Sequence, residues 1–437
     1  MNKSNIFINT HFSSISELKN NHDLIAFYIG LFLLPSALPI SLLFILYSTI
    51  FSILKNKEDF INDKINIFFL FACFMLLIST FTHYFGYFDL NYKSNWDPSL
   101  SLIGLANWIP LIVLFIGSQK YLKTTELRKI FVMVLLSGSI PVLFSCFSQY
   151  FLKWYGPYEY MNGLIIWYQR PLSNFLGVTG LFSNQNYTAS WLNIIWPFAI
   201  VYFISIKKNF IKKIFSFLIL LAIFIFIILT GSRAGWLGMI CAFPLVFGSK
   251  SIKWFFPSII FFLSFIAAII FPIFGKTSQN FLQTYIPKFL WINFSSITYE
   301  GWDTSRIEIW VAALKGIRDN FFFGNGATSF PYFFQYETSF WKGHTHNLPL
   351  ELSFSYGVPV ALIILGTITF IIYKGFKNQY LNKKTILKEN IYEKAWFGSL
   401  LILILGHMVD IQYFDARISI IGWLLLAGLK NILNYDL

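Results

Sequence analysis

The sequence predicts an all-α fold, a polytopic membrane bundle of about twelve transmembrane helices with one large loop that carries an amphipathic helix. Hydrophobic residues make up 56% of the 437 residues and charged residues only 12%, about half the share in soluble domains. The apolar residues form long runs without polar alternation, so they indicate helices and not the strands of a membrane barrel. Basic residues, which give a net charge of +13, concentrate between alternate runs, as in membrane proteins.

Twelve apolar runs are candidates for membrane spans. They cover residues 24–38, 39–54, 65–87, 98–117, 128–152, 187–205, 213–230, 234–249, 253–274, 347–374, 395–414 and 417–434. Pro35 and Pro39 interrupt the first apolar stretch, and proline breaks a helical ladder, so we expect two short helices joined by a tight turn. A single long tilted helix over residues 24–54 is the alternative.

The positions of lysine and arginine predict the orientation of these spans. With the N-terminus in the cytoplasm, the short inside loops hold most of the basic residues, as the positive-inside rule requires. The outside loop near 88–97 has only Lys93, and the outside loop 153–186 has only Lys153 and Arg170. The inside residues are Lys55, Lys57, Lys64, Lys120, Lys123, Arg128, Lys129, Lys207, Lys208, Lys212, Lys213, Lys250, Lys253, Lys374, Lys377, Lys383, Lys384, Lys388 and Lys394.

We expect one integral membrane domain over residues 1–437, with a large outside loop, residues 275–346, inserted between the ninth and tenth spans. A connection of this length is usually functional. Within the loop, Ser305 and Glu308 form a capping-box pattern, which predicts the start of an amphipathic helix on the outer face of the membrane or over the bundle. The apolar residues that recur at helical spacing after it are Ile307, Trp310, Val311, Leu314 and Ile317.

Two arginines are candidates for function, because ionisable residues at membrane depth are costly. Arg233 lies between two apolar runs and is flanked by Gly231 and Gly235, which allow another backbone to approach closely. Arg306 stands in the first turn of the loop helix, where a cation opposes the helix dipole. The simpler interpretations are an interfacial arginine that snorkels to lipid headgroups and a solvated surface residue.

The segment His344-Thr345-His346-Asn347 precedes the tenth predicted span. Histidine titrates near neutral pH, so His346 is a candidate general base that takes a proton from a hydroxyl group. His346 and Gly357 are eleven residues apart, about three helical turns, and are expected on one helix face. A zinc site at the two histidines would need a third ligand, and the spacing of Glu351 matches no known zinc motif. A histidine at headgroup level is the simpler alternative.

Further polar residues lie at or near the predicted outer ends of the spans. Asn347 is expected to cap the tenth span, and Asp410 and Arg417 flank a short outer turn and are expected to pair with each other. An outward cluster of arginines suits a phosphate-bearing ligand. The sequence has no P-loop lysine and no Asp-x-Asp pair, so it indicates neither ATP hydrolysis nor a metal-bound nucleotide sugar. The candidates for substrate binding are Arg170, Asn347, Glu351, Asp410 and Arg417.

These residues resemble motifs of the O-antigen ligase and polymerase family of bacterial glycosyltransferases. The stretch 231–236, GSRAGW, is similar to the arginine motif of that family. Residues 306–310, RIEIW, running on to Gly324-Asn325-Gly326, are similar to the helix of its large loop. His346-Asn347, nine further residues and Gly357 resemble the ligase signature. That signature continues with Gly, Thr or Tyr three residues later, where Val360 stands here, so ligase and polymerase both remain open.

The resemblance implies transfer of a glycan from undecaprenyl pyrophosphate to a hydroxyl, on the periplasmic side of the bacterial inner membrane. For a ligase the acceptor is lipid A–core. The resemblance further implies that Arg233 and Arg306 bind the pyrophosphate and that His346 is the base. Attack opposite the pyrophosphate would invert the anomeric centre. No metal, cofactor, nucleotide or nucleic acid is expected, and membrane lipids are the remaining partners.

Three alternatives remain open. A polymerase of the same family would join repeat units while they are still linked to the lipid, and a protein O-oligosaccharyltransferase would glycosylate a polypeptide. A transporter of lipid-linked glycans is less favoured. Transporters place charges near the midplane and often show repeated halves, whereas the charges here lie near the outer ends of the spans and no repeat is evident.

Overall fold

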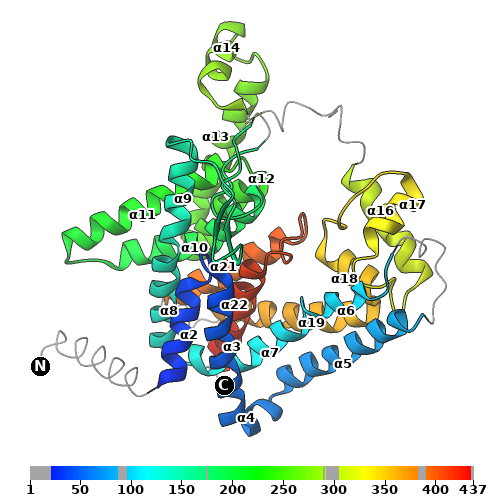
Figure 1. Ribbon diagram of the computed structural model, residues 1–437. Coiled ribbons are helices and arrows are strands. Elements are labelled where there is room, and N and C mark those ends of the chain that lie inside the picture. The colour runs from blue at the N-terminus through cyan, green and yellow to red at the C-terminus, as the bar shows by residue number, and fades with distance from the viewer. Residues whose placement is uncertain are drawn as a thin grey trace, which may run out of the picture.

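The computed structural model describes residues 21–86, 96–173, 176–288, 291, 305–381 and 390–434. The regular structure of these residues is helical, apart from one sheet of two short antiparallel strands. Figure 1 shows the helices running in several directions, with the first helices in blue and the last one in red at the centre of the bundle. The predicted all-α membrane fold is confirmed.

The helices follow the apolar runs closely. Before the strands they are α2 (His22–Leu33), α3 (Leu38–Lys55), α4 (Lys57–Ile61), α5 (Lys64–Tyr84), α6 (Leu100–Leu105), α7 (Ile109–Ser118), η2 (Gln119–Leu122), α8 (Thr125–Gly138) and α9 (Ile140–Phe151). Strand β1 (Tyr158–Tyr160) pairs with β2 (Ile165–Trp167). The later helices are α10 (Gln185–Ser205), α11 (Phe210–Leu229), α12 (Arg233–Phe247), η3 (Gly248–Ser251), α13 (Ile252–Ile270), α14 (Lys276–Tyr285), α16 (Arg306–Asp319), α17 (Phe330–Thr338), α18 (Leu348–Tyr356), α19 (Val358–Phe376), η4 (Lys377–Leu381), α21 (Ile391–Gly406) and α22 (Ala416–Asn434).

Nine helical segments in the described ranges are long and apolar enough to cross a membrane. The other three predicted spans coincide with α2, α12 and α21, which have 12, 15 and 16 residues. A helix rises about 1.5 Å per residue, so these three are shorter than the roughly 30 Å of a hydrocarbon core. A multi-pass membrane protein is confirmed, and the count of twelve spans is not.

The helical hairpin predicted at the first apolar stretch is present. Helices α2 and α3 pack against each other on either side of a turn at residues 34–36. Gly30 makes this contact close, because a Cβ at Gly30 would lie 2.7 Å from Ile45 Cγ1. Ser41 Oγ also donates a hydrogen bond of 2.6 Å to the Gly30 carbonyl. The alternative of one long helix is therefore wrong, and the turn falls where Pro35 interrupts the ladder.

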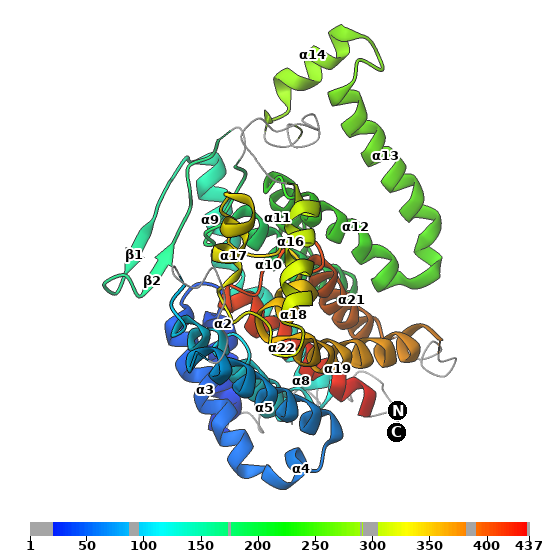
Figure 2. The same ribbon diagram turned by 90° about the vertical axis from the view of Figure 1, so that its right-hand side faces the viewer.

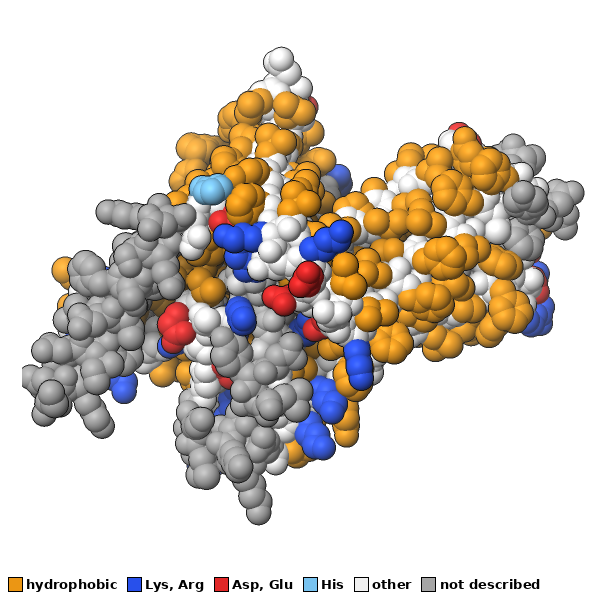
Figure 3. All heavy atoms as spheres, turned by 90° about the horizontal axis from the view of Figure 1, so that it is seen from below, with side chains coloured by type: hydrophobic (Ala, Val, Ile, Leu, Met, Phe, Trp, Pro, Cys, Tyr) orange, Lys and Arg blue, Asp and Glu red, His pale blue; other side chains and the backbone are white. Residues whose placement is uncertain are grey.

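Partly buried ion pairs connect helix ends that the predicted topology places on the inside. They are Lys120 with Asp23, Arg128 with Glu393, and Lys430 with Asp63, at N–O distances of 2.8, 3.0 and 2.7 Å. Figure 3, viewed from the end near α4, shows basic and acidic side chains gathered near the middle of this face. The grouping of these loops on one side is therefore supported. Lys93, Lys383, Lys384 and Lys388 lie outside the described residues, as does the side chain of Lys250.

The prediction of one continuous span over residues 347–374 is wrong. The helix is broken at Gly357, which has φ +90° and separates α18 from α19. His346 and Gly357 therefore do not share one helix face. The break admits a neighbouring loop, because the N–H of Val358 donates to the carbonyl of Phe321 at 2.8 Å. A backbone conformation that favours glycine and a contact from a distant loop together explain the break.

The loop that enters this break carries Gly324-Asn325-Gly326. The N–H of Asn325 donates to the carbonyl of Phe354 at 2.7 Å, and the N–H of Gly326 to the carbonyl of Ser355 at 3.0 Å. Asn325 Nδ2 also donates to the carbonyl of Gly316 at 3.0 Å, which ties the loop to the end of α16. Two of the three motifs that suggested the family, the loop helix with its Gly-Asn-Gly end and the segment that ends at Gly357, therefore meet at one contact between α16 and α18.

Replacing Gly357 with alanine is expected to destabilise this contact by at least about 2 kcal/mol, because the region of φ and ψ is almost confined to glycine. The new Cβ would also lie 2.2 Å from the carbonyl oxygen of Phe322. A lower unfolding temperature of the detergent-purified protein measures the effect. Gly366→Ala is the matched control, since Gly366 lies within α19 and a Cβ there meets nothing within 4 Å. Equal unfolding temperatures for the two variants would contradict the interpretation.

Within the predicted loop 275–346 the structure contains α14, α16 and α17. Figure 2 shows α13 and α14 extending away from the bundle, and Figure 1 shows α16 and α17 beside α18. The capping box of Ser305 and Glu308 is confirmed. The predicted apolar face of α16 is only partly right, because Ile307, Val311 and Leu314 are exposed. The face that packs on α17 and α18 is formed by Ile309, Ala312, Ala313 and Ile317.

Candidate active site

His346 lies in the turn before α18, and its ring contacts a carboxylate from a distant part of the chain. His346 Nδ1 is 2.9 Å from Asp410 Oδ1. Asp410 lies between α21 and α22, in the short outer turn that the sequence predicted. A histidine whose ring is oriented by a carboxylate has the geometry of a general base.

The Asp410 carboxylate accepts hydrogen bonds on both oxygens. Asn186 Nδ2, in the first turn of α10, donates to Oδ2 at 3.0 Å, and the N–H of Ile411 donates to Oδ1 at 3.1 Å. Burial opposes ionisation of Asp410, but the hydrogen bond from His346 and the nearby positive charge outweigh burial and hold its pKa below the usual range. An ionised carboxylate can only accept, so neutral His346 carries its proton on Nδ1 and has Nε2 as its basic nitrogen.

Arg306 lies next to this pair. As predicted, it is in the first turn of α16, and its Nη1 donates to the carbonyl of Val409, the residue before Asp410. The Arg306 charge is close enough to lower the pKa of Asp410. The side chain is exposed to solvent, so the guanidinium is accessible to an anion as well.

Arg233 is the first residue of α12, where Ser232 is the N-cap. Its side chain is exposed, and the next residues, Ala234 and Gly235, line a pocket of about 120 Å³. Val409 and Gln412 line the same pocket. The pocket therefore adjoins both the start of α12 and the carbonyl group of Val409 that accepts a hydrogen bond from Arg306. The close approach predicted from the glycines is confirmed, because a Cβ at Gly235 would lie 2.8 Å from Ala189 Cβ.

Asn347 and Glu351 support the turn that holds His346. Asn347 caps α18, as predicted, by accepting from the N–H of Leu350 at 3.1 Å, and its Nδ2 donates to the carbonyl of Met408 at 2.9 Å. The buried carboxylate of Glu351 accepts from the N–H of Thr345 at 2.9 Å. The structure thus gives both residues a scaffold role, and contact with a substrate stays a prediction for them.

Residues 218–365 match the family model described as O-antigen ligase. This segment, about a third of the chain, is similar to the O-antigen ligase family. The matched segment runs from α11 into α19 and contains Arg233, Arg306 and His346, whereas Asp410 lies beyond its end. The match supports a membrane glycosyltransferase-like enzyme of the ligase or polymerase type. No curated protein matches the chain.

The predicted ion pair between Asp410 and Arg417 is wrong. Arg417 is buried and pairs with Asp415, with Nε 2.9 Å from Oδ1, and its guanidinium lies 4.0 Å from the centre of the Phe182 ring. Asp415 is only two residues away and uses both of its oxygens, while Asp410 turns toward His346. This geometry favours a structural role for Arg417.

Arg170 follows the β-hairpin and is exposed. Its guanidinium lies 5.9 Å from the centre of the Tyr168 ring, and its main chain is held by Thr179 Oγ1, which accepts from the N–H of Arg170 at 3.1 Å. Within the described ranges, no contact links Arg170 to His346 or Asp410. Its predicted role in binding substrate stays a prediction.

His344, His346 and Asp410 place their potential ligand atoms within 4.8 Å of one another, as a metal site would require. The Nδ1 atoms of both histidines already bond to protein groups, since His346 Nδ1 donates to Asp410 and His344 Nδ1 accepts from the N–H of His346 at 3.1 Å. The positive charge of Arg306 beside them would also repel a cation. The three residues therefore fit a hydrogen-bonded network better than a metal site.

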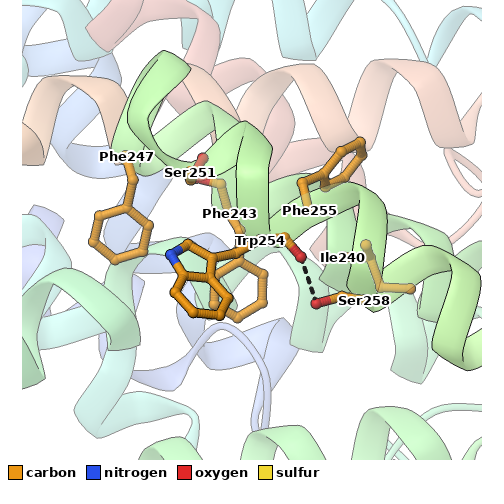
Figure 4. Close-up of a pocket in the computed structure, with 7 residues that line it drawn as sticks. All are labelled: Ile240, Phe243, Phe247, Ser251, Trp254, Phe255 and Ser258. Atoms are coloured by element: carbon orange, nitrogen blue, oxygen red, sulfur yellow. Dashed lines mark hydrogen bonds between the residues drawn. The ribbon is translucent and has the colours of Figure 1, made fainter.

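A larger groove of about 460 Å³ lies between α12 and α13, away from these residues. Figure 4 shows its wall of aromatic side chains, among them Phe243, Phe247 and Trp254, and the hydrogen bond of 2.8 Å from Ser258 Oγ to the Trp254 carbonyl. None of the seven lining residues is ionisable. The groove therefore supplies no acid, base or charged group for binding an anion.

Sequence reasoning missed three contacts at this site. Asn186 bonds to Asp410, the carbonyl of Val409 accepts from Arg306, and His344 accepts from the main chain of His346. The polar triplet 184–186 at the start of an apolar run was the only available signal for Asn186. A backbone carbonyl leaves no signal in a sequence, so the role of Val409 needs the tertiary structure.

Proposed function

We propose that this protein transfers a polysaccharide from undecaprenyl pyrophosphate to a hydroxyl of lipid A–core. The observation that carries the proposal is the His346–Asp410 pair, with Arg306 bonded to the carbonyl of the residue before Asp410. A base next to a cation suits a reaction in which a hydroxyl loses its proton while a pyrophosphate leaves. The family match supports the same class of reaction.

In the proposed reaction, the acceptor oxygen attacks the anomeric carbon of the lipid-linked sugar. The acceptor proton goes to His346 Nε2, and Asp410 stabilises the imidazolium that forms. The bond from the anomeric carbon to the pyrophosphate oxygen breaks, and its electron pair leaves with undecaprenyl pyrophosphate. Arg233 and Arg306 bind that pyrophosphate and neutralise its growing charge. The pocket beside both arginines would hold the part of the donor next to the pyrophosphate.

The remaining details follow from this arrangement. Attack from the side opposite the pyrophosphate inverts the anomeric centre. The arginines supply the positive charge that a metal supplies in other glycosyltransferases, so the proposed reaction is independent of metal. His346, Asp410 and Arg306 lie at the ends opposite the inner ion pairs, which supports an active site on the periplasmic face of the bacterial inner membrane.

Replacing Asp410 with asparagine is expected to lower kcat by about tenfold to a hundredfold, because an amide no longer holds His346 in its Nδ1–H tautomer or stabilises its cation. Transfer between purified donor and acceptor measures the rate. Asp415→Asn is the control, since Asp415 pairs with Arg417 and has no described contact with His346. A normal rate in Asp410→Asn would exclude the orienting role of Asp410.

A lipopolysaccharide gel of a strain without the gene tests the function itself. If full-length O-antigen is lost from lipid A–core while long polymer accumulates on the lipid carrier, the protein is a ligase. If core with one repeat unit remains, the protein is a polymerase, the alternative that Val360 keeps open by departing from the ligase signature. An unchanged ladder excludes both and leaves a protein O-oligosaccharyltransferase or, less favoured, a lipid-linked glycan transporter.

A further inference from the structure

His346 has a main-chain conformation that is uncommon for residues other than glycine. Its φ is +54°, in the left-handed region, where a side chain is disfavoured. Such strain persists only where surrounding groups hold the backbone in place, and it is frequent at active sites. The structure must therefore contain groups that hold the turn at residues 344–347.

Several of these groups are visible. The main chain of Thr345 is held on both sides, because its N–H donates to Glu351 and its carbonyl accepts from Trp310 Nε1 at 3.1 Å. Thr345 Oγ1 donates to the carbonyl of Asn347 at 2.9 Å. The N–H of His346 itself donates to His344 Nδ1 at 3.1 Å, so His344 holds the strained residue directly.

The His344 ring is suited to this contact. Its centre lies 4.1 Å from that of the His346 ring and 5.5 Å from that of Phe414, so the imidazole contacts two rings. Burial and the neighbouring His346 lower the pKa of His344 to about 4. At neutral pH the ring is therefore neutral and carries one proton, and the hydrogen bond that Nδ1 accepts from the N–H of His346 places that proton on Nε2.

We propose that His344 is a positioning residue for His346, because its Nδ1 accepts the main-chain N–H of His346 and so holds the left-handed turn that directs the imidazole of His346 at Asp410. His344 itself does not touch the substrate. The inference rests on the proposed function, in which His346 is the base. A base displaced from its working geometry slows the chemical step without weakening substrate binding, so we expect a lower kcat and an unchanged KM.

Two substitutions distinguish the effect of losing the acceptor atom of His344 from the effect of losing its ring. In His344→Asn, the side-chain oxygen can accept the N–H two residues later, as asparagine does in turns, although the ring is lost. In His344→Phe, the ring contact with Phe414 remains but no acceptor does. We expect His344→Asn to keep kcat within about threefold of the wild type, and His344→Phe to lower it by about tenfold to a hundredfold with KM unchanged.

The assay uses full-length protein in nanodiscs, with lipid-linked donor and lipid A–core extracted from the deletion strain. Three results overturn the proposal: wild-type kcat in His344→Phe, equal loss in both variants, and a rise in KM for either substrate. The second would assign the effect to the ring, and the third would place His344 in contact with the substrate. Protein without any transfer activity would instead contradict the proposed function.

A spectroscopic readout tests the positioning without reference to activity. In protein labelled with ¹⁵N-histidine, the Nδ1–H signal of His346, assigned by its absence in His346→Gln, reports the bond to Asp410. We expect the signal in the wild type and in His344→Asn, and its loss in His344→Phe. A signal that persists in His344→Phe would show that the turn is held without His344.

Discussion

His346→Gln is expected to lower kcat for glycan transfer by about a hundredfold to ten-thousandfold, the range that a positioned general base contributes. Glutamine has a similar reach, and its amide can donate to Asp410 as the Nδ1–H of His346 does. It has no basic nitrogen, so it cannot accept the proton of the acceptor hydroxyl. The variant therefore removes the base while leaving the contact with Asp410 possible.

The measurement is single-turnover transfer in nanodiscs, with donor and acceptor both saturating, so that chemistry limits the rate. His22→Gln is the matched control, because His22 begins α2 at the inner end and contacts Tyr47 and Phe51. Its rate should equal that of the wild type. If His346→Gln transferred glycan at a normal rate, the base would have to be another group, and the catalytic role of the His346–Asp410 pair would be withdrawn.

Arg233→Ala is expected to reduce transfer by about a hundredfold to a thousandfold, the usual effect of removing one group that stabilises a developing charge. Arg233 is exposed at the start of α12, next to the pocket that Val409 also lines, so its loss removes positive charge at the proposed position of the pyrophosphate. Arg233→Lys should recover part of the rate, because lysine supplies charge but not the planar fork that binds two phosphate oxygens.

Abundance of the protein in the membrane must be near normal for the result to count. Arg318→Ala is the control, since Arg318 is exposed on α16 and pairs with its neighbour Asp319. Loss of the charge of Arg318 should leave the transfer rate unchanged. Full activity in Arg233→Ala would exclude Arg233 from the reaction, and equal losses in the two variants would point to a general effect of surface charge.

Apolar runs predicted most helices well, because each run is a local property of the chain and lipid requires its backbone to be helical. The two prolines at the first stretch and the capping box before α16 were also read correctly, since a turn and a cap depend on a few adjacent residues. The break at Gly357 was missed. It depends on the loop at residues 321–326, which enters from elsewhere in the chain and bonds to both sides of the break.

At the candidate site, too, features that depend on nearby residues were predicted, and contacts between distant residues were not. His346, Arg306 and Arg233 were selected from the sequence, because ionisable residues beside apolar runs are few and each one is costly. The partner of Asp410 was predicted wrongly. Arg417 is nearer in sequence than His346, but Asp415 takes the guanidinium of Arg417, and Asp410 meets His346 across 64 residues.

The sequence by itself determined that this protein is a multi-pass helical membrane protein, which helix ends share a side, and which residues are candidates for chemistry. Hydropathy and charge act locally, so these properties can be read along the chain. Only the tertiary structure decided that His346 meets Asp410, that Arg306 donates to the carbonyl of Val409, and that His344 accepts from the N–H of His346. Each of these depends on where atoms lie in the folded chain, and no local pattern encodes those distances.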